Sequence, residues 1–447
     1  MKDLTKGPIP LHILAMAAPI MIGMLVQTLY FLVDLYFVAR IGDTALAGVG
    51  AAGNFTFAVM ALTQMLGVGT VAVISHSVGA GDREGANQVF NQSLLLAAAC
   101  GLLALVGGYA LAGPYMRTLG ADAATAAAGI SYLYWYVPGL ALQFALISMG
   151  SALRGTGIAQ PSMVVQLATV LLNAILAPVL IAGIGTGHPF GVAGAGLATS
   201  ISVAVGSALM VLYFLRLEHY VGFDPKRWRP DFASWRRILA IGLPAGGEFA
   251  LMFIYLAVIY SIIRSFGAGA QAGFGVGSRV MQAVFLPAMA VAFAIAPIAG
   301  QNFGARNAER VRRTFRDGAL IGSALMLVLT LLCQWRAQML VAVFASDPEV
   351  LAVGAGFLHV ISWNFVASGI IFTCSGMFQA LGNTWPSVIS SATRLLTFAV
   401  PAVWLSQRAG FRLEQAWYLS VVTVTLQALL SVWLVRRELR ERLKFPT

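Results

Sequence analysis

Runs of about 20 apolar residues recur along almost the whole chain, and they restrict its fold more than any other feature. A helix of that length crosses the hydrocarbon core of a bilayer. Inside hydrocarbon the backbone must satisfy its own hydrogen bonds, which a helix does within one segment. Only 10% of the 447 residues are charged, against about 25% in a soluble domain. The sequence therefore predicts an all-α integral membrane protein.

Twelve such runs are bounded by glycine, proline or charged residues. We predict transmembrane helices over residues 11–39, 46–75, 88–113, 126–150, 160–184, 191–215, 238–264, 270–299, 318–345, 351–379, 385–407 and 414–435. The longest charged connection separates the sixth run from the seventh. It predicts a six-helix N-terminal lobe over 1–217, a cytoplasmic linker loop over 218–237 and a six-helix C-terminal lobe over 238–447.

The charge balance predicts the orientation in the membrane. The chain has 28 Lys and Arg against 17 Asp and Glu, for a net charge of +11. Because these basic residues lie in the gaps between apolar runs, they suggest topology signals, and no nucleic-acid partner is expected. Twelve spans place both termini on one side, and 20 of the 28 basic residues lie there. Cytoplasmic loops are enriched in Lys and Arg, so we expect a multi-pass inner (plasma) membrane protein with both termini in the cytoplasm.

The two halves of the chain repeat at one fixed offset along the sequence. Pro19 recurs as Pro244, and Pro161 recurs as Pro386. The same offset also relates several glycines and alanines: Gly42, Ala45, Gly48, Gly79, Ala80 and Gly157 match Gly267, Ala270, Gly273, Gly304, Ala305 and Gly382. A duplication explains one gapless offset better than coincidence among abundant small residues. Six helices in each copy give the two lobes the same orientation, a parallel repeat typical of secondary transporters with a substrate path between the halves.

Asp34 is one of two acids deep inside the predicted helices. A charge at that depth costs at least ~2.5 kcal/mol, so we expect the residue to have a function or a stabilising partner. Gln27 and Tyr30 precede it by seven and four residues and share its helix face, which predicts a cavity lining. Desolvation favours the neutral carboxyl, so that Asp34 could bind and release a proton. Alternatively, Asp34 extends to the membrane surface or caps a neighbouring helix.

Glu248 is the other deep acid, and Arg279 lies at a similar depth in the following, antiparallel span. A structural ion pair between them would keep Glu248 charged. Without that pair, Glu248 would form a second cation site. The sequence leaves both alternatives open.

Two further residues suggest ion coupling or motion. Pro19 removes a backbone hydrogen bond and permits a helix bend, either static or mobile. Asn173 is a deep polar residue that is either part of the ion site or a hydrogen-bonding contact between helices.

The motifs of other functional classes are missing from the sequence. Cys100, Cys333 and Cys374 lie in apolar runs without CxxC spacing, and no histidine has the neighbours of a metal site. The glycine-rich stretch at 67–81 has no GK[ST] and no strand before it. We expect neither an enzyme, nor a metal, nor a cofactor beyond H⁺ or Na⁺ as the coupling ion.

Several segments together resemble the multidrug and toxic compound extrusion (MATE) transporters. They are Gln27 to Gly42 with its DLYFVARIG, Val78-Gly-Ala-Gly-Asp82, Leu153-Arg-Gly155, Gly191 to Thr199 and Gly300-Gln-Asn-Phe-Gly304. The resemblance covers essentially the whole chain. It implies twelve helices in two V-shaped lobes, and export of cationic or aromatic compounds in exchange for H⁺ or Na⁺.

The resemblance also implies roles for single residues. Asp34 matches the family's helix 1 carboxylate, Pro19 its bend and Asn173 its helix 5 asparagine, while Glu248 resembles the acid of a second-lobe cation site. Two acids found in some branches are missing, because Ala177 replaces one and residues 351–384 contain none. Neither familiar cation site is therefore complete.

We therefore predict a monomeric antiporter for small organic cations or amphipathic compounds, working by alternating access among membrane lipids. The alternative is a flippase or exporter of a lipid-like or peptide metabolite on the same fold. Such a path would need a basic cavity, for which Arg279 and Arg394 are the candidates.

Overall fold

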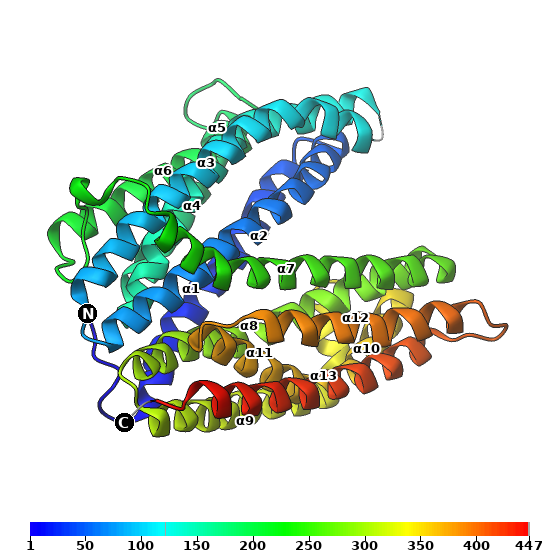
Figure 1. The fold of residues 1–447 in the computed structure, drawn as a ribbon. Helices are drawn as coiled ribbons and strands as arrows, with labels where there is room; N and C mark the ends of the chain where they lie inside the picture. The colour runs from blue at the N-terminus through cyan, green and yellow to red at the C-terminus, as the bar shows by residue number, and fades with distance from the viewer. Residues whose placement is uncertain (121, 446–447) are drawn as a thin grey trace. The chain divides into compact units, whose positions relative to one another are not determined.

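The computed structural model describes residues 1–120 and 122–445, and these residues form helices and short connections without a strand. The first half of the chain contains α1 (Ile9–Ala39), α2 (Asp43–Gly79), α3 (Arg83–Leu119), α4 (Ala123–Gly155), α5 (Gln160–Ala182) and α6 (Val192–Arg216). Figure 1 shows them in blue to green. Each coincides within a few residues with a predicted span, because long apolar runs leave a helix as the only structure that satisfies the backbone in lipid.

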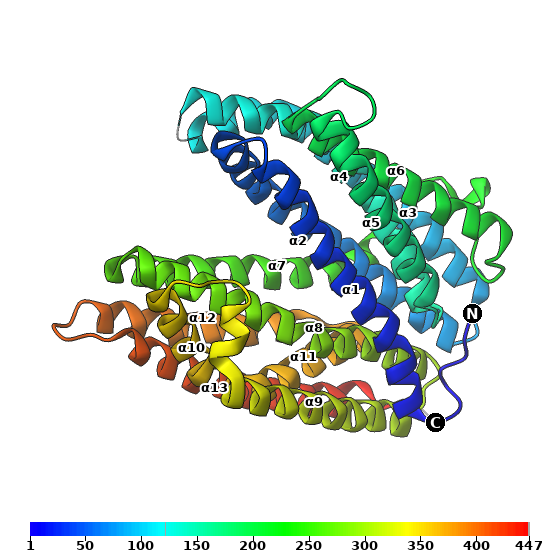
Figure 2. The same cartoon turned by 180° about the vertical axis from the view of Figure 1, so that it is seen from behind.

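The second half, also visible from behind in Figure 2, contains α7 (Phe232–Ile263), α8 (Ala268–Gly304), α9 (Ala308–Ala342), α10 (Pro348–Ile361), α11 (Asn364–Ala380), α12 (Trp385–Ser406) and α13 (Leu413–Arg442). Two single turns of 3₁₀ helix complete the described elements, at Pro225–Arg227 and Arg264–Phe266. Among the described residues, eleven helices are individually long and apolar enough to cross a membrane, and the bent pair of α10 and α11 counts as a twelfth, broken span. The predicted class, all-α with twelve membrane helices in two repeated halves, is confirmed.

The two halves repeat in their turns as well as in their sequence. Asp82 caps the start of α3, and Asn307, its equivalent at the repeat offset, caps α9. The residue before each cap has a left-handed backbone, with φ +73° at Gly81 and +56° at Arg306. Equivalent residues therefore end and start equivalent helices, as a duplicated chain requires.

The chain divides into two compact units whose limits lie inside α1 and α7. One unit contains residues 1–3 and 22–242, and the other contains 4–21 and 243–447. The first part of α1 therefore belongs to the unit that contains most of the second repeat. The first part of α7 belongs to the unit that contains most of the first repeat. The predicted lobe and linker limits, which place whole helices in one lobe, remain predictions.

Residues 4–7 are attached to α8 and α9 of the second unit by a polar cluster. The backbone N–H of Leu4 donates to Gln301 Oε1 at 3.0 Å, and the Leu4 carbonyl accepts from Asn302 Nδ2 at 3.2 Å. Arg310 Nη1 donates to the Gly7 carbonyl at 3.0 Å, while its Nε donates to Asn302 Oδ1 at 2.9 Å. The GQNFG segment thus holds the start of the chain against α8 and α9.

The predicted span 351–379 differs from the structure, because it is bent by 59° between α10 and α11. Side chains of α9 satisfy carbonyls that the break exposes. Gln334 Nε2 donates to the His359 carbonyl at 2.7 Å, and Thr330 Oγ1 donates to the Ser362 carbonyl at 3.0 Å. Apolar periodicity does not reveal the bend, because no proline or glycine marks it and its partners lie about 30 residues earlier.

We expect Gln334→Leu to lower the stability of the protein by about 1–3 kcal/mol, because it removes the donor to both the His359 carbonyl and the Ser362 hydroxyl. Thermal unfolding of the purified protein in detergent measures this. The matched control is Gln338→Leu, one turn along α9 at an exposed position, which should change stability by less than about 0.5 kcal/mol. Equal effects of the two variants would contradict this account of the bend.

Candidate ion and substrate sites

A polar cluster inside the first unit joins α1, α5 and α6. Tyr30 Oη donates to Thr199 Oγ1 at 2.7 Å. Asn173 Nδ2 approaches Tyr30 Oη at 3.3 Å and Thr199 Oγ1 at 3.5 Å. Asn173 is fully buried, and Thr199 is 5% exposed. The structure thus brings two predicted site residues together and adds Thr199, which the sequence places only in a family motif.

Asp34 lies one turn beyond Tyr30 on α1 and is 8% exposed. Its Oδ1 atom is buried without a hydrogen-bond partner, and so is Asn173 Oδ1. Buried oxygens of this kind cost about 1–3 kcal/mol each, more for a charged group. The site therefore contains two acceptors that a proton or another cation would satisfy.

The other predicted residues of this face have different positions. Gln27 is exposed and has no hydrogen bond to the Tyr30 cluster. Pro19 is buried within the continuous helix α1, two residues before the chain passes from one compact unit to the other. Pro244 lies in α7 at the repeat-equivalent position, close to the other passage at residue 242. Both prolines are thus placed where a bend would affect both units.

Glu248 in the second unit is surrounded by serines. Its Oε2 accepts from Ser375 Oγ and its Oε1 from Ser391 Oγ, both at 3.4 Å. Ser387 Oγ donates in turn to Ser375 Oγ at 3.3 Å. These hydroxyls from α11 and α12 replace part of the water that a carboxylate loses on burial.

Arg279 does not pair with Glu248 in the part of the chain that the structure describes. Five ion pairs join residues that are close in sequence, on the helix ends or in the linker: Arg227–Asp224, Arg313–Asp317, Arg316–Asp317, Arg437–Glu441 and Arg442–Glu438. Arg279 is exposed on α8. Of the two alternatives for Glu248, the geometry favours the unpaired carboxylate.

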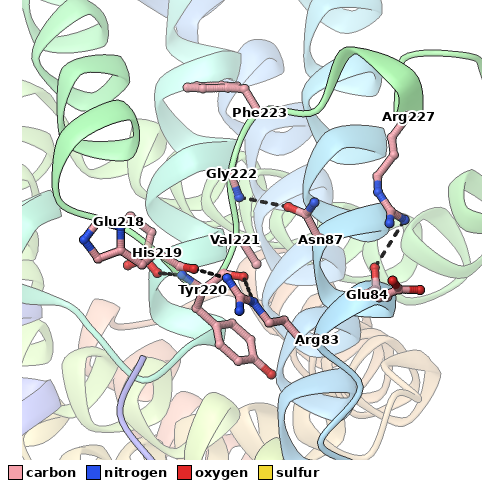
Figure 3. Close-up of a pocket in the computed structure, with 10 residues that line it drawn as sticks. All are labelled: Arg83, Glu84, Asn87, Glu218, His219, Tyr220, Val221, Gly222, Phe223 and Arg227. Carbon is pink, nitrogen blue, oxygen red and sulfur yellow. Dashed lines mark hydrogen bonds between the residues drawn. The ribbon is translucent and has the colours of Figure 1, made fainter.

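A third polar region lies outside the spans, where the linker crosses the start of α3 (Figure 3). It surrounds a cavity of about 530 Å³. The guanidinium of Arg83 donates to the carbonyls of His219 and Tyr220, and Asn87 Oδ1 accepts from Gly222 N–H at 2.8 Å. Further along the linker, the Ser234 hydroxyl donates to Asp231 and holds the pKa of that carboxyl below its usual range. These groups attach the linker to α3, and most of their hydrogen-bonding capacity is used in that attachment.

Two duplicated halves of membrane helices, each with a polar cluster inside the bilayer region, define a polytopic transporter with an internal repeat. The MatE family model matches residues 19–179 and 244–405. The chain therefore belongs to the MatE family of multidrug efflux transporters. The two matches begin at residues 19 and 244, which are the positions of the repeated prolines in α1 and α7.

Known relatives cover nearly the full chain. A protein named FAD transporter in Shewanella oneidensis is 28% identical over 90% of this chain and 89% of its own length. The multidrug export protein MepA of Staphylococcus haemolyticus is 26% identical over 95% of this chain and 92% of its own.

Solved structures of transporters also match this fold over nearly the full chain. A multidrug resistance MATE family transporter of the MOP superfamily in an outward-facing conformation has a TM-score of 0.92 and 26% identity, covering 99% of this chain and 98% of its own. A MOP superfamily transporter from Pyrococcus furiosus, described as having a binding pocket of reverse polarity, gives the same score, identity and coverage.

We expect the effects of Glu248→Gln and Arg279→Met on stability to add, because the two side chains do not touch. Thermal unfolding of both single variants and of the double variant measures the coupling. Independent sites should agree with additivity within about 0.5 kcal/mol. Recovery of stability in the double variant would instead reveal an ion pair.

Proposed function

We propose that the protein is a secondary antiporter that exports cationic or aromatic drug-like compounds in exchange for H⁺ or Na⁺ by alternating access. The observation that carries this proposal is the buried pair of unpartnered oxygens, Asp34 Oδ1 and Asn173 Oδ1. A fixed donor from the protein would have made the site structural. A site that lacks one is suited to a cation that arrives and leaves.

Protonation of Asp34 would remove a charge that is costly in hydrocarbon. The neutral carboxyl could then donate to a nearby acceptor, which would change the packing of α1 against the Tyr30 cluster. Pro19, fifteen residues earlier in the same helix, lacks the N–H that would bond to the Ala15 carbonyl. A change at Asp34 would therefore bend α1 most easily at Pro19, and bound substrate would weaken ion binding by the same coupling free energy.

The second candidate is an exporter of a metabolite, which could be lipid-like, peptide-like or of another class. The relative named FAD transporter favours a metabolite. The relatives named as multidrug export proteins favour drug-like compounds. Ethidium is a suitable probe for the first candidate, because it is both cationic and aromatic.

We expect Asp34→Asn to abolish ion-coupled export while the protein still folds. Asparagine resembles the neutral carboxyl in shape but cannot release a proton, and the change removes a buried charge. Ethidium uptake into inverted vesicles under an imposed pH or sodium gradient measures the effect. Asp43→Asn, the same replacement at an exposed position, is the control. Wild-type rates in Asp34→Asn would contradict the role of Asp34.

We also propose that the protein lies in the inner membrane with both termini and the linker in the cytoplasm. Single cysteines in place of Arg229 and Ser346, both exposed, test this in a chain without its three native cysteines. A membrane-impermeant maleimide should label Arg229→Cys only in inverted vesicles and Ser346→Cys only in intact spheroplasts. The opposite pattern would reverse the orientation, and labelling of both from one side would refute the twelve-span topology.

A further inference from the structure

The internal repeat places a tyrosine at the same position in each unit, since the offset that relates Pro19 to Pro244 also relates Tyr30 to Tyr255. Each tyrosine hydroxyl lies within hydrogen-bond distance of a hydroxyl on the last helix of its repeat. Tyr30 donates to Thr199 of α6 at 2.7 Å, and Tyr255 Oη lies 3.1 Å from Ser420 Oγ of α13. The two units thus contain similar tyrosine-centred clusters, although Ser420 is not the repeat equivalent of Thr199.

The charge beside this cluster is reversed between the units. The acid Asp34 follows Tyr30 by one turn, whereas the buried apolar residue Ile259 occupies that position after Tyr255. In the second unit the charged neighbour is Arg394 of α12, whose guanidinium carbon lies 4.1 Å from the centroid of the Tyr255 ring. The first cluster therefore carries an acid and the second a base.

The guanidinium of Arg394 has no acceptor among the residues that the structure describes. Its Nε atom is buried without a hydrogen-bond partner, and no carboxylate lies within ion-pair distance. The deep acid of this unit, Glu248, accepts from Ser375 and Ser391. Because an arginine in a membrane span is costly, an unpaired one indicates a function. Stacking on a ring occupies the face of the guanidinium and leaves its N–H edges available.

Asn364 adds a second, independent feature to this cluster. It is the first residue of α11, directly after the break in the span, and it is 4% exposed. Its Nδ2, an N–H donor, lies 3.4 Å from Ser420 Oγ. The N-terminal end of a half-helix carries partial positive charge, and broken membrane helices direct such ends toward anionic groups of substrates.

We propose that Arg394, Tyr255, Ser420 and Asn364 form a binding site for an oxyanion, the phosphate or carboxylate group of an aromatic substrate. The proposal rests on the export function proposed above and specifies the substrate class of its second candidate, the metabolite exporter. The two N–H edges of Arg394 would bind the oxyanion in the bidentate geometry that guanidinium favours. The ring of Phe398 is fully buried and packs against that of Tyr255, 4.9 Å away between centroids, so it helps to fix the Tyr255 ring in place.

A matched pair of fluorescent probes tests this site, because riboflavin 5′-phosphate and riboflavin differ only in the phosphate. Binding to the purified full-length protein in detergent is measured by fluorescence quenching. We expect the wild type to bind the phosphorylated probe at least about tenfold more tightly. Arg394→Met should bind both probes equally, and Arg394→Lys should retain part of the preference. The control is Arg336→Met, which removes an arginine stacked on Trp335 elsewhere in the same unit.

Three results would overturn the proposal: wild-type protein that binds neither probe, wild-type protein that binds both equally, or a preference that survives in Arg394→Met. A purely structural Arg394, which only balances the charge of Glu248, predicts a different pattern. Arg394→Met would then lose thermal stability that Glu248→Gln restores, and the probe preference would not change.

The experiment also separates this proposal from the proposed function. Wild-type protein that exports ethidium but does not prefer the phosphorylated probe would refute the oxyanion site alone. Protein that prefers the phosphorylated probe but exports neither ethidium nor a flavin would refute the export function alone.

Discussion

Hydrocarbon offers no hydrogen-bond partner, and this constraint explains both the helices of the protein and the exceptions within them. The break between α10 and α11 is tolerated because Thr330 and Gln334 supply donors to exposed carbonyls. Asp34, Asn173 and Arg394 each keep a buried polar atom without a partner. An ion, a substrate group or water can satisfy a polar atom that the protein itself leaves without a partner, and the candidate sites are built around these three residues.

Duplication preserved the framework of the two units while their charges diverged. Caps and turns recur because each copy needs them to fold, as at Asp82 and Asn307. The acids do not recur. Glu248 corresponds to Gly23 in the first repeat, eleven residues before Asp34, which is about 16 Å along a helix. An ionisable residue is costly in a membrane and gives no folding advantage, so its position follows function.

Much of the fold could be predicted from the sequence, because apolar run length and loop charge are local properties. All twelve spans were located, and the repeat offset equals the spacing of the two family-model matches. The bend at Ser362 could not be found in this way, since the residues that stabilise it belong to another helix. The assignment of residues 4–21 to the second compact unit could not be predicted either, because it depends on contacts with helices distant in sequence.

The sequence by itself determined the membrane class, the spans, the repeat, the resemblance to the family and the two acids that required an explanation. Only the tertiary structure decided which side chains meet them. It placed Thr199 beside Tyr30, serines rather than Arg279 around Glu248, and Tyr255 beneath Arg394. Hydropathy depends on neighbours along the chain, whereas the partner of a buried polar group depends on how helices distant in sequence pack and rotate against one another.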